Sequence, residues 1–259
     1  MRRFPWLSFF LSLFLLTAPP LRAQESGDSK APEEEEDWLE YYYQNPTPER
    51  FVPQMKAWAA DGTLDLEQAK PALIAFLSQV IHQNSRKLAE WYEALAGLEP
   101  QQMQIMHTAM LYSRTKEADE ILGERYGEAY QDEKAETRKI LERPLDKVGT
   151  MDMLWGFFYA TGSEGAIRRI VAAFRFRDAP DKPPGVAVPE GYLPLYKELP
   201  HFAYDSLLAN AGRHPRLVEI LRKMLESDAT LLEREKEGVY AVLSALDPKR
   251  YPPKKEEEN

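Results

Sequence analysis

The 259-residue sequence contains no cysteine, and this absence excludes several classes of protein. A disulfide-stabilised scaffold, a zinc site with thiolate ligands, a thiol-dependent enzyme and a lipoprotein anchored through an acylated cysteine all need that residue. Basic residues are also few, because 33 Lys and Arg stand against 42 Asp and Glu and give a formal net charge of −9. Nucleic-acid affinity comes largely from Lys and Arg that displace counterions, so no nucleic-acid partner is expected.

Long hydrophobic runs are missing after residue 17, and the run before it predicts an export signal. Arg2 and Arg3 precede an apolar stretch over residues 4–17, and Leu21-Arg22-Ala23 offers a cleavage site. The stretch falls within the ~7–15 residues of a signal peptide and below the ~18 of a membrane span, although an uncleaved anchor remains an alternative. We therefore expect cleavage after Ala23, a periplasmic or secreted product and no integral membrane segment after signal removal.

Hydrophilic segments flank the part of the sequence that can form a core. Residues 24–37 include four consecutive glutamates and are expected to be a flexible acidic linker, because so few apolar residues cannot offset the entropy of ordering. Residues 251–259 are expected to be a disordered tail for the same reason. Residues 38–250 are therefore predicted to form a single helical domain, with residues 1–23 as the signal peptide.

The pattern over residues 38–250 predicts an all-α fold. Apolar residues recur at helical spacing, proline and glycine stand at the joints, and alternating segments of strand type are nearly absent. The predicted helices span residues 48–60, 71–84, 86–96, 101–112, 116–125, 128–141, 151–160, 164–174, 202–211, 215–226 and 231–246.

Three of these helices share a register that indicates an internal repeat. Asn84, Ser163 and His214 are taken as helix caps, and the positions 4, 7 and 11 residues after each are apolar. These positions are Leu88, Trp91 and Leu95; Ile167, Ile170 and Phe174; and Val218, Leu221 and Leu225. Such spacing lies on one helix face. The prediction is a set of antiparallel helical hairpins stacked as an irregular α-solenoid, with chance alignment of amphipathic helices as the alternative.

Residues 73–95, 153–174 and 204–225 resemble helical-hairpin solenoids such as tetratricopeptide-like proteins. The diagnostic Trp, Gly-Tyr, Ala and Pro positions of that repeat are absent here. The chain is also similar to uncharacterised exported all-helical proteins of bacteria. These resemblances imply an architecture and a compartment, and they transfer no functional residue.

Residues 175–200 depart from the helical pattern because they contain six prolines and two glycines. Prolines at this density predict a long loop between two hairpins, and loops this long are often functional or disordered. Tyr192 and Tyr196 are candidate partner-binding residues on this proline-rich insertion. In the alternative, they fold back as a structural lid over the gap between Phe174 and Phe202.

Aromatic residues near the start of the domain form a second candidate surface. Tyr41, Tyr42 and Tyr43 are consecutive, so they cannot all point inward, and at least one is expected to be exposed as a recognition edge. By contrast, helical spacing places Trp155 and Tyr159 on one face that is expected to be core.

No motif predicts a catalytic, cofactor-binding or metal-binding residue. The four histidines lack the spacing of a zinc site, and neither a nucleophile elbow nor a glycine-rich phosphate loop is present. Paired carboxylates remain possible, and Asp152 and Asp205 stand beside apolar residues, where burial would raise a carboxyl pKa. Both are also consistent with acids that stabilise the first turn of a helix.

Together these observations favour an exported helical scaffold that binds a protein or another ligand, without a cofactor and without catalysis of its own. Its partner would be an unknown protein or another component of the cell envelope. The alternative is a periplasmic hydrolase that acts on cell-wall glycan or peptide through paired carboxylates. A carrier of apolar ligands is a third hypothesis, and it requires a central cavity.

Overall fold

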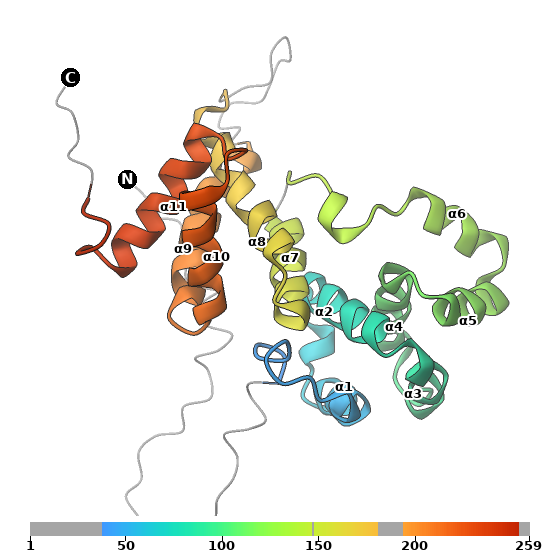
Figure 1. Ribbon diagram of the computed structural model, residues 1–259. Coiled ribbons are helices and arrows are strands. Elements are labelled where there is room, and N and C mark those ends of the chain that lie inside the picture. Colours follow the sequence, from blue (N-terminus) through green and yellow to red (C-terminus); the bar gives the residue numbers. More distant parts are fainter. Residues whose placement is uncertain (1–37, 147, 181–193, 254–259) are drawn as a thin grey trace, which may run out of the picture. The chain divides into compact units, whose positions relative to one another are not determined.

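The computed structural model describes residues 38–146, 148–180 and 194–253, which contain 11 α-helices and no strand (Figure 1). The all-α prediction is therefore confirmed. The predicted signal peptide, the linker over residues 24–37 and Tyr192 lie outside the described residues. The helices are α1 (Phe51–Ala60), α2 (Lys70–Gln83), α3 (Leu88–Ala94), α4 (Pro100–Ser113), α5 (Lys116–Tyr126), α6 (Glu128–Glu136), α7 (Val148–Thr161), α8 (Glu164–Val171), α9 (Leu199–Ala211), α10 (Pro215–Ser227) and α11 (Glu233–Leu246).

Proline stands in the first turn of several helices, where its missing N–H would have no helical partner in any case. Pro200 takes this position in α9. The predicted insertion over 175–200 is therefore too long at both ends, because α9 starts at Leu199 and a 3₁₀-helix continues from α8 over Ala172–Asp178. Another short 3₁₀-helix covers Leu195–Lys197.

The helix predicted over residues 128–141 is wrong at its C-terminal end. It stops at Glu136, and Thr137 is extended with φ −78° and ψ 115°. Two tertiary contacts account for the stop: the Arg114 guanidinium donates to the Thr137 carbonyl, and Ile140 is buried in the core. When the chain leaves the helix after Glu136, the Thr137 carbonyl accepts from Arg114 and Ile140 is buried, so tertiary contacts override helix propensity here.

The buried side chains form two clusters, one built mainly on α1–α5 and the other on α7–α11. Helices α2 and α7 pack against each other between these clusters, and Ile74 and Tyr159 contact both. Gly156 permits the close approach, because a Cβ there would lie only 2.0 Å from the carbonyl oxygen of Ala72. Any larger residue would push the two helices apart.

The apolar positions of the predicted register are all buried in two of its three copies. All six positions on α3, α8 and the turns after them are buried. Of the three predicted positions on α10, Leu221 is buried, and Val218 and Leu225 are half-buried. The buried side of α10 consists of Leu217, Ile220, Leu221 and Met224. The third copy is therefore wrong, because α10 is rotated by about one residue from the predicted face.

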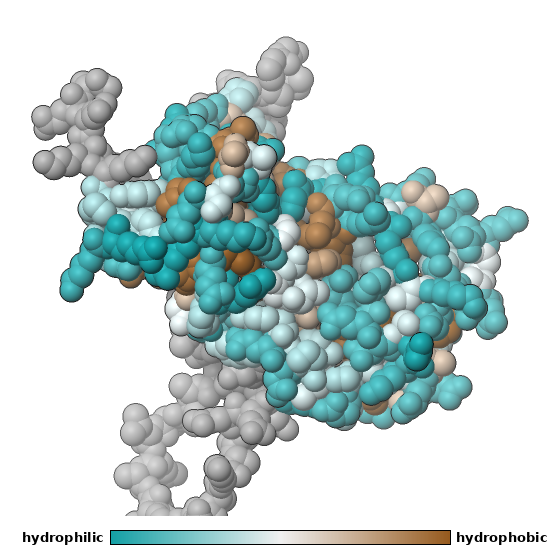
Figure 2. Space-filling model, in the orientation of Figure 1, coloured by the Kyte–Doolittle hydropathy of each residue, from teal (hydrophilic) through white to brown (hydrophobic). Residues whose placement is uncertain are grey.

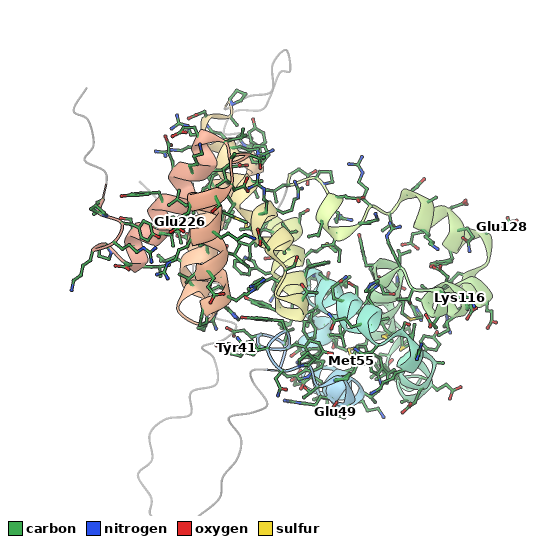
Figure 3. The ribbon with its side chains drawn as sticks, viewed as in Figure 1. Tyr41, Glu49, Met55, Lys116, Glu128 and Glu226 are labelled. Carbon is green, nitrogen blue, oxygen red and sulfur yellow. The ribbon has the colours of Figure 1, made fainter. Side chains whose placement is uncertain are left out.

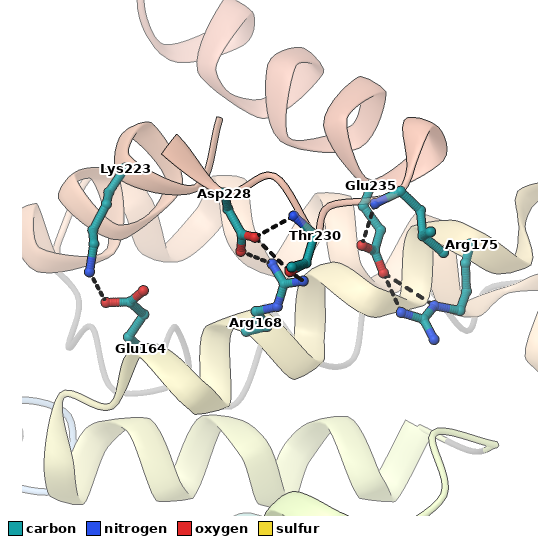
Figure 4. Close-up of polar contacts among 8 residues, drawn as sticks. Glu164, Arg168, Arg175, Lys223, Asp228, Thr230 and Glu235 are labelled. Carbon is teal, nitrogen blue, oxygen red and sulfur yellow. Dashed lines mark hydrogen bonds and ion pairs between the residues drawn. The ribbon is translucent and has the colours of Figure 1, made fainter. Parts of the chain in front are cut away.

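Salt bridges tie α8 to α10 and to the turn after it, and tie the 3₁₀-helix after α8 to the start of α11 (Figure 4). Arg168 contacts Asp228, and Lys223 lies 2.8 Å from Glu164. Glu235 is 2% exposed and pairs with Arg175. Since the Glu235 carboxylate is removed from water, its pairing with Arg175 matters more for stability than the surface pairs do.

The C-terminal tail prediction begins too early. Tyr251 is buried, its ring centroid lies 6.0 Å from that of Tyr240, and the Tyr240 hydroxyl donates to the carbonyl of Pro252 at 2.7 Å. On the face drawn in Figure 2, hydrophilic residues cover most of the surface, and apolar residues gather over α8, α10 and α11. Among the described residues, the large apolar side chains classed as exposed are Tyr126 and Leu232.

Candidate functional site

Two buried histidines organise the polar side chains inside this fold. His214 immediately precedes α10 and is fully buried, while His107 lies on α4 and is 6% exposed. Each imidazole lies within hydrogen-bonding distance of a tyrosine hydroxyl. No motif in the sequence indicates either site, because the partners are distant in the chain and no local spacing marks them.

His214 connects the N-terminal turn, residues 38–44, to α10. Its Nδ1 lies 3.3 Å from the Tyr43 hydroxyl, and its Nε2 lies 3.1 Å from Oε1 of Glu40. The other Glu40 oxygen accepts from Arg213 at 2.9 Å, and Gln44 donates to the Tyr43 hydroxyl at 3.0 Å. The Nε2–Oε1 contact is poorly aligned for a hydrogen bond, so its contribution is mainly electrostatic.

Aromatic rings enclose the His214 imidazole. The centroids of Tyr41, Tyr43, Phe158 and Tyr159 lie 5.1–5.9 Å from it. Burial raises the pKa of the Tyr43 and Tyr159 hydroxyls, so both are phenols at neutral pH. The Tyr43 hydroxyl accepts from Gln44 and lies within hydrogen-bonding distance of Nδ1 of His214. The groups within the cluster therefore engage one another, as expected of a structural clamp.

The candidate recognition edge at Tyr41–Tyr43 is largely inside the molecule. Tyr42 is 1% exposed and packs edge-on against Trp38 and Phe76, while Tyr41 and Tyr43 are half-buried. Figure 3 labels Tyr41 beside the N-terminal turn. Tyr41 and Tyr43 keep part of their surface exposed, whereas the turn directs Tyr42 into one core cluster, and the rings of Tyr41 and Tyr43 lie beside His214. A recognition role for these three residues stays a prediction.

His107 forms a second cluster with residues from α3 and α5. Its Nε2 lies 2.9 Å from the Tyr92 hydroxyl and its Nδ1 lies 2.8 Å from that of Tyr126. Arg125 donates to both hydroxyls, at 3.2 and 3.3 Å. Burial, with a smaller contribution from the Arg125 charge, lowers the pKa of His107, so its imidazole is neutral at neutral pH.

A pocket of about 120 Å³ lies beside His107, between α4, α5 and α6. Its lining combines aromatic, apolar and polar side chains: Gln104, His107, Thr108, Leu111, Leu122, Tyr126, Ala129, Tyr130 and Glu133. Tyr126 is 42% exposed at this pocket, whereas Tyr130 is buried and donates to Asp119. Sites for drug-sized ligands measure about 300–1,000 Å³, so this pocket suits one side chain or one sugar unit.

A larger depression of about 320 Å³ lies next to this pocket, and Glu133 lines both. Its other lining residues are Glu136, Thr137, Arg138, Arg143 and Pro144. Glu136 and Arg138 are exposed, so water screens the charges that this depression presents. Its lining also holds no aromatic side chain, in contrast to the pocket beside His107.

Tyr196 is held within the fold. Its ring centroid lies 6.1 Å from that of Phe176, and its hydroxyl donates to the carbonyl of Pro180. These contacts support the structural alternative for this residue. Tyr192, the other candidate on the proline-rich insertion, is outside the described residues.

The two carboxylates considered for catalysis differ in their surroundings. Asp152 is half-buried on α7, and burial raises its pKa to about 7. Asp205 is exposed on α9. Asp152 therefore has the pKa of a general acid that works near neutral pH, and water surrounds Asp205.

Within the described ranges, no three His, Asp or Glu side chains are grouped so that they could hold a metal ion. No helix in that part of the chain has the length and apolar character needed to cross a membrane. Comparison with known proteins finds no matching family model, no matching curated protein and no matching solved structure.

Proposed function

We propose that the chain is an exported helical scaffold of solenoid-like architecture that binds a component of the cell envelope and catalyses no reaction itself. The signal-like residues 1–23 support the compartment, and the all-helical fold supports the architecture. The His214 cluster supports a structural role for the N-terminal turn, because its polar groups are directed at one another.

The pocket between α4, α5 and α6 is the observation that carries this proposal. Tyr126, which is 42% exposed, stands at this pocket, and its hydroxyl bonds to His107 and Arg125. A ring held in this way loses little conformational entropy when a ligand contacts it. An aromatic ring also offers apolar area together with a polar tip, which supports a role in recognition.

Sedimentation with purified cell-wall sacculi and with an envelope protein fraction tests the proposal. We expect the mature protein to be retained by one of these fractions, and Tyr126→Ala to weaken the retention. Leu232→Ala is the matched control, because it removes another exposed apolar side chain that does not line the pocket. Failure of both fractions to retain the protein, or equal retention of the two variants, would contradict the proposal.

The alternative function is hydrolysis of cell-wall glycan or peptide, and the pKa of Asp152 is the observation that favours it. A carboxyl group with a pKa of about 7 is protonated in part at neutral pH and is able to donate a proton to a leaving group. Incubation of purified sacculi with the wild type and with Asp152→Asn tests this. Release of soluble fragments by the wild type alone supports hydrolysis, and the absence of release by the wild type excludes it for this substrate.

A further inference from the structure

We propose that the pocket between α4, α5 and α6 binds one neutral saccharide unit of an envelope glycan. This inference rests on the proposed binding function and names the chemistry of the ligand. A pyranose ring has an apolar C–H face and a rim of hydroxyl groups, so a site for it needs apolar area together with hydrogen-bonding groups.

All three helices contribute apolar or aromatic side chains to the pocket lining. Leu111 and Leu122 are buried in its lining, with Ala129 beside them, and the phenol rings of Tyr126 and Tyr130 complete this part of the wall. Aromatic rings combine a large apolar area with little side-chain entropy to lose. This surface matches the C–H face of a sugar.

Hydrogen-bonding groups in the same lining are available to a ligand. The side chains of Gln104 and Glu133 make no hydrogen bond or ion pair within the described residues. The Thr108 hydroxyl donates to the Gln104 carbonyl at 2.8 Å, which leaves its oxygen free to accept. A carboxylate accepts two hydroxyl groups and an amide both donates and accepts, so together they suit adjacent hydroxyls on one ring.

The distribution of charge selects against ionic ligands. Glu133 is the charged residue in the lining and disfavours an anion. A cationic ligand is disfavoured because both phenol rings already have cations nearby: the Arg125 guanidinium carbon lies 5.6 Å from the Tyr126 centroid, and Lys134 Nζ lies 6.0 Å from that of Tyr130. A neutral ligand avoids both the repulsion of an anion by Glu133 and the repulsion of a cation by Arg125 and Lys134.

His107 serves as a positioning residue in this arrangement. Its neutral imidazole holds the hydroxyls of Tyr92 and Tyr126, one as a donor and the other as an acceptor. Arg125 donates to the same two oxygens. The ring of Tyr126 is thereby fixed at the pocket before any ligand arrives.

Titration of the mature protein with a short oligomer of β-1,4-linked N-acetylglucosamine, followed by calorimetry or NMR, tests the inference. We expect saturable binding that Glu133→Gln weakens about tenfold, because the bonds to a charged acceptor are replaced by weaker ones. Glu136→Gln is the control: it removes an exposed glutamate from the same helix that does not line this pocket, and binding should be unchanged. Thermal melting of both variants establishes that they are folded.

The outcomes separate this inference from the proposed function. Retention on sacculi together with no response to the oligosaccharide contradicts the saccharide inference and leaves the binding function standing. Binding of a cell-wall stem peptide at the same residues also contradicts it, because the ligand is then a peptide. Loss of all retention contradicts both proposals. Equal oligosaccharide affinity for the wild type and Glu133→Gln places any sugar site elsewhere.

Discussion

The Asp152 carboxylate lowers the stability of the fold whenever it is ionised. Its pKa is about 7 in the folded chain against 3.8 as the ordinary value, and burial is the cause. The folded state therefore holds this proton more tightly than the unfolded state does. By linkage, the free energy of unfolding decreases as the pH rises from about 4 to about 7, by roughly 1.4 kcal/mol per unit of pKa difference at most.

Replacement of Asp152 by Asn should remove this penalty. We expect the variant to be more stable than the wild type at pH 8 by about 1–3 kcal/mol, after allowance for partial exposure, and equal to it at pH 4. Urea titration at both pH values measures the difference. Asp205→Asn, at an exposed position, should change stability by less than about 0.5 kcal/mol at either pH. Parallel pH curves for Asp152→Asn and the wild type would contradict the assignment.

The surroundings of a residue could be predicted from the sequence where its neighbours in the chain set them. They could not be predicted where the contacts come from residues distant in the chain. Asp152 was singled out because apolar residues surround it in the chain, and the structure places it in a half-buried position. His107 and His214 were assigned no site. The Tyr126 partner of His107 lies 19 residues away, and the Glu40 partner of His214 lies on the N-terminal turn. Short motifs do not encode such pairings.

At the scale of elements, the crossing of α2 and α7 depends on a missing side chain. Gly156→Ala should destabilise the protein by about 1–3 kcal/mol, because the added Cβ would lie 2.0 Å from the carbonyl oxygen of Ala72 and force the backbones apart. This effect opposes the gain of about 1 kcal/mol in helix propensity. Gly97→Ala is the control, because nothing lies within 4 Å of its added Cβ. An unchanged or higher urea midpoint for Gly156→Ala would show that α2 and α7 admit the added Cβ without a cost in stability.

The rotation of α10 predicts a contrast between neighbouring positions. Leu221→Ala and Ile167→Ala remove fully buried side chains and should each cost about 2–5 kcal/mol. Val218→Ala removes less volume from a half-buried position and should cost less than about 1 kcal/mol. Calorimetric melting of the three variants measures these costs. A loss for Val218→Ala above about 1 kcal/mol would place Val218 on the buried face, as the register predicted from the sequence has it.

The existence of the helices was predictable because their apolar periodicity and their proline and cap residues agree. The ends of the helices were harder to predict. The hydrogen bond from Arg114 to Thr137 and the burial of Ile140 end α6 early, and both depend on tertiary structure. The rotation of α10 has a similar origin. Its predicted cap, His214, makes no side-chain capping bond and turns instead toward Glu40 and Tyr43.

At the scale of the whole molecule, the prediction concerns processing and compartment. We expect the mature protein to begin at Gln24 and to be recovered in the soluble exported fraction, because the apolar run of residues 4–17 has the length of a signal peptide. Mass spectrometry of the intact protein from cell fractions measures this. Retention of Met1 in a membrane fraction would show that the run serves as an anchor.

The bond between Glu40 and Arg213 also sets the order in which the fold can be completed. A ribosome adds about 5–20 residues per second, so roughly 9–35 s separate the synthesis of these two residues. During that interval the Glu40 carboxylate lacks Arg213 and the Tyr43 hydroxyl lacks His214, although the first turn of the domain already has partners in Phe76, Phe158 and Tyr159. A chain that emerges N-terminus first therefore completes this cluster only when the residues just before α10 arrive.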